Sequence, residues 1–105
     1  MDGTYCDFAI NHDLHKFDSI PSGFAFAGQN VPSFDKVCAA IEEAHKKIAH
    51  FGFAFWDVCV DENGDPVIVE TNLRYPDTLI PQACGIGGYL GEYTEEILKR
   101  CARRP

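Results

Sequence analysis

The chain has 105 residues, of which 46% are hydrophobic and 24% charged, and its formal net charge is −7. This length suits a single domain spanning residues 1–105, and the ordinary composition excludes a disordered chain. The acidic balance argues against nucleic acid and anionic membrane surfaces as partners. The sequence shows neither a signal peptide nor an apolar run of about 18 residues, so we expect a cytoplasmic protein with no membrane partner.

The N-terminal half predicts a strand, a loop and a helix. Residues 4–10 alternate polar and apolar side chains, as a half-buried strand does, and residues 12–28 are interrupted by proline and glycine. Ser33 is a good N-cap for a helix that Gly52 can end. The apolar stripe of this helix consists of Val37, Ile41, Ala44 and Ile48.

The C-terminal half predicts a β-hairpin at residues 53–60 and 66–71, an irregular stretch at 73–88 and a helix at about 89–101. The whole order predicts an α+β fold in which two helices pack on an antiparallel sheet. The cysteines are odd in number and form no C-x-x-C pair, which predicts reduced thiols in the core rather than disulfides or a zinc site. These residues are Cys6, Cys38, Cys59, Cys84 and Cys101.

The hairpin carries the most informative residues. Asn63-Gly64 is a strong signal for a two-residue type I′ turn, which needs positive φ at both positions. With that loop, Asp57 lies directly opposite Glu70, at a Cβ separation of roughly 4.5–5.5 Å where like charges destabilise a sheet. Asn72 shares a face with Glu70 because side chains alternate along a strand. A longer loop would shift the register by one residue and separate the two acids.

Two opposed carboxylates beside an amide oxygen are typical of a site for a hard cation, and all-oxygen ligands select Mg²⁺ or Ca²⁺. The alternative is a pair of solvated acids. Asp57 stands among Phe, Trp and Val residues, so we expect its strand to be buried on both faces and its charge to need a partner. Lys16 and Arg74 are the nearest cations, and either could contact a phosphate.

Three other features of the sequence are less informative about function than the hairpin. The acidic turn at residues 61–65 resembles a calcium loop only superficially, because Pro66 stands where an EF-hand needs glycine. The glycine-rich turn at residues 85–88 either cradles a phosphate or simply connects two elements. Cys84 has no partner base, so a role as nucleophile is not expected.

The residues Trp56-Asp57-Val58, Asn63-Gly64 and Glu70-Thr71-Asn72 together resemble the C-terminal end of the ATP-grasp fold. The upstream segments 21–34 and 44–45 are similar to the sugar-transfer-associated ATP-grasp group, whose members are linked to polysaccharide biosynthesis or described as hexapeptide-transferase-like. The resemblance implies a fold like the C-terminal half of ATP-grasp proteins. It also implies that Asp57, Glu70 and Asn72 hold one or two Mg²⁺ ions against ATP.

The same resemblance implies an ATP-dependent ligase that joins a small carboxylate substrate to an amine or similar nucleophile through an acyl-phosphate. Arg74 and Lys16 are the candidate nucleotide contacts, and no residue is identified as a general base. The adenine pocket and phosphate-binding lysine of the family have no counterpart here, so we expect a partial C-terminal lobe with little catalysis alone. Its partner would be the missing N-terminal lobe. The alternatives are a self-associating, non-catalytic interaction module and a calcium-binding module.

Overall fold

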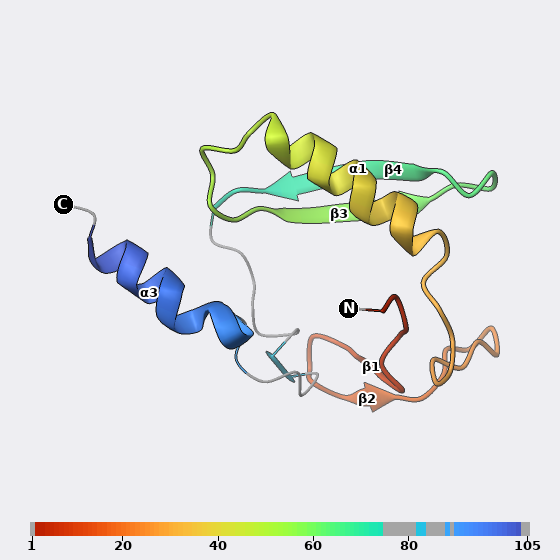
Figure 1. Cartoon of the computed structure of the whole chain (residues 1–105). Helices are drawn as coiled ribbons and strands as arrows, with labels where there is room; N and C mark the ends of the chain where they lie inside the picture. Colours follow the sequence, from red (N-terminus) through yellow and green to blue (C-terminus); the bar gives the residue numbers. More distant parts are fainter. Residues whose placement is uncertain (1, 75–81, 84–87, 89, 104–105) are drawn as a thin grey trace.

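The computed structural model describes residues 2–74, 82–83, 88 and 90–103. In this part of the chain the strands form two separate two-stranded antiparallel sheets, which confirms the predicted α+β class (Figure 1). One helix lies across the larger sheet and a second stands apart from it (Figure 1). The elements are β1 (Ala9–Ile10), β2 (Lys16–Phe17), α1 (Phe34–Lys46), β3 (Phe55–Val60), β4 (Pro66–Asn72), the 3-10 turn η1 (Gly91–Tyr93) and α3 (Thr94–Ala102).

The predicted strand at residues 4–10 is mostly wrong. Only its last two residues form β1, which pairs with β2 inside the region expected to be loop. The start of the segment instead turns, because the Asp2 carboxylate accepts hydrogen bonds from the Thr4 backbone N–H at 3.0 Å and the Thr4 hydroxyl at 2.7 Å. Such short polar side chains offer the backbone a local alternative to a strand ladder.

Gly3 fastens this N-terminal turn to the start of α1. Its φ is +81°, and a Cβ atom placed there would lie 2.8 Å from the Phe34 ring. Its carbonyl accepts a hydrogen bond from the Val31 N–H at 2.7 Å. Only glycine combines that backbone conformation with so close an approach.

Helix α1 begins where the sequence predicts and ends earlier. Ser33 occupies the N-cap position, but its φ is 50° and its side chain does not cap the helix; its carbonyl accepts from the Val37 N–H at 3.0 Å. The helix ends at Lys46 rather than near Gly52, and single turns fill the interval up to Phe51. The predicted apolar stripe is half-buried and packs on β3 and β4.

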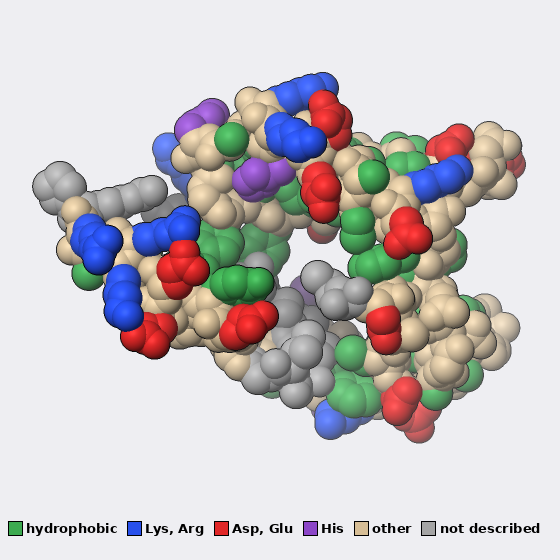
Figure 2. Space-filling model, in the orientation of Figure 1, with side chains coloured by type: hydrophobic (Ala, Val, Ile, Leu, Met, Phe, Trp, Pro, Cys, Tyr) green, Lys and Arg blue, Asp and Glu red, His purple; other side chains and the backbone are tan. Residues whose placement is uncertain are grey.

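The chain is open rather than compact. No hydrophobic side chain is fully buried among the described residues. The accessible surface is 8418 Å², whereas about 5,900 Å² is expected for a compact chain of 11.7 kDa. The radius of gyration is 15.8 Å, against about 13 Å for a compact domain of this length. Figure 2 accordingly shows hydrophobic side chains at the visible surface beside α3 and below the hairpin.

The cysteine prediction is correct in one respect and wrong in another. The four cysteines in the described region are free thiols, but Cys6, Cys59 and Cys101 are exposed and Cys38 is half-buried, so they do not form a core. The cause is the open packing, which covers each apolar segment on one side at most. Cys84 lies outside the described residues, and so does most of the predicted glycine-rich turn.

The predicted C-terminal helix at 89–101 is divided into η1 and α3. Two ion pairs stabilise α3, Lys99 with Glu95 and Arg100 with Glu96. In each pair the two partners lie one helical turn apart. No helix within the described ranges is long and apolar enough to cross a membrane.

Candidate functional site

The hairpin loop differs from the predicted type I′ turn. Gly64 has φ 79°, but Asn63 is not among the residues with positive φ. The Asp61 N–H donates to the Asp65 carbonyl at 2.9 Å, which leaves three residues in the loop instead of two. The Asp61 carboxylate also accepts from the N–H groups of Asn63 at 2.9 Å and Asp65 at 2.8 Å, so this side chain builds the turn.

A β-bulge corrects the register that the longer loop would otherwise shift. Near the loop, Val58 pairs with Ile68, yet one step further Asp57 pairs with Glu70. Val69 is therefore an extra residue on β4, opposite no residue of its own. The predicted pairing of Asp57 with Glu70 is confirmed, although two irregularities that cancel produce it rather than one regular ladder.

The two acids and Asn72 share the face of the hairpin that α1 does not cover. Asn72 pairs with Phe55, two residues before Asp57 on β3. On the opposite face, Trp56 contacts the His45 ring of α1 at a centroid distance of 6.2 Å. Asp57, Glu70 and Asn72 are all exposed. The prediction that this strand is buried on both faces is therefore wrong, because α1 packs on one face only.

The opposed carboxylates carry an uncompensated charge. Neither Asp57 nor Glu70 has an ion-pair or hydrogen-bond partner among the described residues. At a separation of about 5 Å in water, two unit charges repel by about 0.8 kcal/mol. The described residues contain no cluster of three His, Cys, Asp or Glu side chains. A metal centre here would therefore need the amide oxygen of Asn72 as its third protein ligand.

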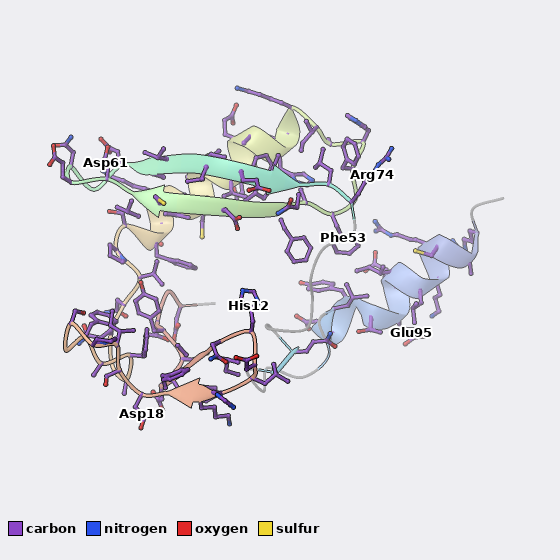
Figure 3. The ribbon with its side chains drawn as sticks, turned by 180° about the vertical axis from the view of Figure 1, so that it is seen from behind. His12, Asp18, Phe53, Asp61, Arg74 and Glu95 are labelled. Atoms are coloured by element: carbon purple, nitrogen blue, oxygen red, sulfur yellow. The ribbon has the colours of Figure 1, made fainter. Side chains whose placement is uncertain are left out.

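The two predicted cationic contacts lie in different places. Arg74 is exposed and stands at the end of the hairpin, two residues beyond Asn72, whereas Asp61 marks the opposite end (Figure 3). Lys16 belongs to β2 in the other sheet, where its ammonium lies 4.4 Å from the centroid of the Phe8 ring. The structure thus brings Arg74, and not Lys16, to the strand that carries Glu70.

Two of the three acids of the hairpin loop, Asp61 and Asp65, make structural contacts. Besides the turn contacts of Asp61, the Asp65 carboxylate accepts from the Lys36 ammonium at 3.1 Å, which ties the loop to α1. The third loop acid, Glu62, has neither kind of contact among the described residues, as is also true of Asp57 and Glu70. Of these three acids, Asp57 and Glu70 are the two that the strand pairing places opposite each other.

One feature of this region was not predicted from the sequence. A hollow of about 610 Å³ lies between α3 and the end of the hairpin, with Phe53 and Tyr93 among its lining residues. The sequence places Phe51 at the end of the predicted helix and Phe53 at the start of the predicted strand, on either side of Gly52. What brings them to α3 is a tertiary arrangement that no local pattern encodes.

The sequence model of the family described as sugar-transfer associated ATP-grasp matches residues 1–96. The chain belongs to this family. No curated protein and no solved structure matches the chain. The ATP-grasp match includes both sheets, α1 and every candidate site residue, and it supports a general ligase-like role for the chain.

Proposed function

We propose that Asp57, Glu70 and Asn72 hold Mg²⁺ for the ATP of an ATP-dependent ligase. The observation that carries this proposal is the cross-strand pairing of Asp57 with Glu70 on the uncovered hairpin face. Membership in the sugar-transfer associated ATP-grasp family supports the same reaction class, the joining of a small carboxylate to an amine or similar nucleophile. A link to polysaccharide or cell-surface biosynthesis is part of the proposal.

The donor set fits Mg²⁺. Two carboxylates and one amide oxygen are hard ligands, and their exposure leaves room for the waters and phosphate oxygens that Mg²⁺ retains. When bound, the ion would neutralise the charge on the ATP phosphates. Asp57 and Glu70 supply negative charge from two strands, while Asn72 adds a neutral oxygen. Arg74, two residues beyond Asn72, is the candidate for a phosphate contact, whereas Lys16 lies on β2 of the other sheet.

The chain by itself should bind Mg-ATP weakly and catalyse little. The proposed ligands occupy one face of a two-stranded hairpin, and all of them are open to water. Phosphoryl transfer depends on positioning and on charge stabilisation in a water-excluded site, so a second wall has to cover this face. That wall would come from another polypeptide segment, such as the N-terminal lobe of an ATP-grasp protein.

Thermal unfolding with and without Mg-ATP tests the proposal. A ligand at one hundred times its dissociation constant adds about 2.7 kcal/mol to the free energy of unfolding, which gives a visible shift in Tm. The shift should appear in the wild type and in Glu62→Gln, an acid of the loop, and should vanish in Glu70→Gln. An equal shift in all three proteins would contradict the assignment, and a larger shift with Ca²⁺ than with Mg²⁺ would favour a calcium-binding module.

The second candidate is a self-associating, non-catalytic module. The open packing favours it, because large hydrophobic side chains are exposed in both sheets and in the η1–α3 segment; they include Phe17, Ile68, Tyr93 and Leu98. Exposed apolar surface of this extent marks interfaces. Light scattering over a range of concentrations tests it. A dimer without nucleotide affinity would support this candidate, and a monomer at every concentration would exclude it.

A further inference from the structure

The hollow beside the hairpin has walls from three parts of the chain. The turn before β3, the residue after β4 and the η1–α3 segment surround about 610 Å³, within the range typical of small-molecule pockets. Figure 3 shows Phe53 at the end of the hairpin that faces α3. The described lining residues include Gly52, Phe53, Leu73, Tyr93, Glu96 and Arg100.

Two of the aromatic side chains that line the hollow are exposed and can contact a ligand. Phe53 is 46% exposed and Tyr93 is 59% exposed, and they reach the hollow from the hairpin and from η1 respectively. Phe51 is half-buried, with its ring centroid 4.4 Å from that of His50. Aromatic rings provide large, rigid apolar surfaces. Such surfaces pack well against the C–H face of a ring-shaped ligand.

Among the described lining residues, the charged side chains are those of Glu96 and Arg100, whose charges are opposite. The Arg100 guanidinium is paired with the Glu96 carboxylate one helical turn away. Both side chains remain largely exposed, so their unused donors and acceptors can still hydrogen-bond a ligand. This combination favours an uncharged molecule that has hydroxyl groups and an apolar face, and it disfavours an anion.

We propose that this hollow binds an uncharged sugar ring. Sugars combine apolar C–H faces with hydroxyl groups, which matches the aromatic walls and the neutral Arg100–Glu96 pair. The sugar would be the acceptor substrate of the ligase, so this assignment rests on the proposed function. Leu73 lines the hollow and follows Glu70 by three residues, a distance of about 10 Å along a strand. A sugar seated here would therefore lie beside the proposed phosphate site.

A titration with methyl glucoside, followed by NMR of the wild-type chain without nucleotide, tests the proposal. We expect shifts at Gly52, Leu73 and Tyr93, and at least a fivefold loss of affinity in Tyr93→Ala. Leu98→Ala is the matched control, because Leu98 is 60% exposed on α3 and does not line the hollow. Equal effects of the two substitutions would overturn the proposal. Tighter binding of cyclohexanol or of glucuronate than of methyl glucoside would also overturn it.

A second experiment tests the sugar site independently of the proposed metal site. Glu70→Gln should leave the affinity for methyl glucoside within twofold of the wild type, because Glu70 does not line the hollow. A protein that binds methyl glucoside but not Mg-ATP would refute the nucleotide site and keep the sugar site. A protein that binds Mg-ATP but not methyl glucoside would refute the sugar site alone.

Discussion

Replacing Glu70 by glutamine should stabilise the chain in the absence of Mg²⁺. Glu70 pairs directly with Asp57 across the hairpin, and neither acid has a compensating partner among the described residues. The substitution keeps the size and hydrogen-bonding capacity of the side chain while it removes one of two like charges. It therefore isolates the electrostatic cost of holding the two carboxylates together.

The size of this gain follows from the geometry. Two charges about 5 Å apart in water repel by about 0.8 kcal/mol, and the Debye length of about 8 Å at physiological salt reduces this to about 0.4 kcal/mol. A small domain gains roughly 4–8 °C in Tm for each kcal/mol, so Glu70→Gln should unfold about 2–3 °C higher than the wild type. The difference should grow at low salt and fade at high salt.

Differential scanning fluorimetry of both proteins at several sodium chloride concentrations measures this effect. Asp57→Asn should give a similar gain, and the double substitution should add little to either single one, because each removes the same repulsion. A lower Tm for Glu70→Gln at every salt concentration would refute the reasoning. It would mean that the carboxylate already makes a favourable contact.

One deletion and two further substitutions test the fold. Deleting Val69 should remove the bulge and leave the two opposed acids paired, as checked by cross-strand NOEs between their strands; loss of those NOEs would contradict the bulge. Gly3→Ala should cost at least about 1 kcal/mol more in denaturant unfolding than Gly23→Ala, because both have positive φ but only Gly3 meets a ring; equal costs would exclude the close contact. The hydrogen bond from the Thr4 hydroxyl lowers the pKa of the Asp2 carboxyl below 3.8. The ionised carboxylate therefore stabilises the folded chain above pH 3.8, and this stabilisation is lost as the pH falls through the lowered pKa. Thr4→Val should raise this pKa toward 3.8 in a carboxyl ¹³C titration, and an unchanged value would contradict the assignment.

The sequence predicts a hairpin at this place and the pairing of Asp57 with Glu70, and both are found. The prediction assumes a regular two-residue loop, whereas a three-residue loop and a bulge at Val69 together produce the observed pairing. The loop type could not be derived as well. The Asp61 carboxylate hydrogen-bonds two backbone N–H groups and thereby selects a longer loop. That contact competes with the turn preference of Asn63-Gly64, and the bulge at Val69 is invisible in the alternation of apolar residues.

Burial was the least predictable property. The apolar neighbours of Asp57 predict a strand covered on both faces, but coverage depends on which elements pack there. Here α1 covers the face that carries Trp56, and the other face is open. The hollow at Phe53 and Tyr93 was missed for the same reason, since it joins segments forty residues apart. An apolar pattern predicts that a face of a strand is buried, but whether it is buried depends on which other elements of the chain pack against it.

Paramagnetic broadening by Mn²⁺ tests the central claim most directly. Mn²⁺ prefers the same oxygen ligands as Mg²⁺ and broadens NMR signals near its binding site. With ATP present, the amide signals of Asp57, Glu70 and Asn72 should broaden first, and excess Mg²⁺ should restore them. Broadening centred on the acidic loop at residues 61–65 instead would contradict a metal centre on the strand face.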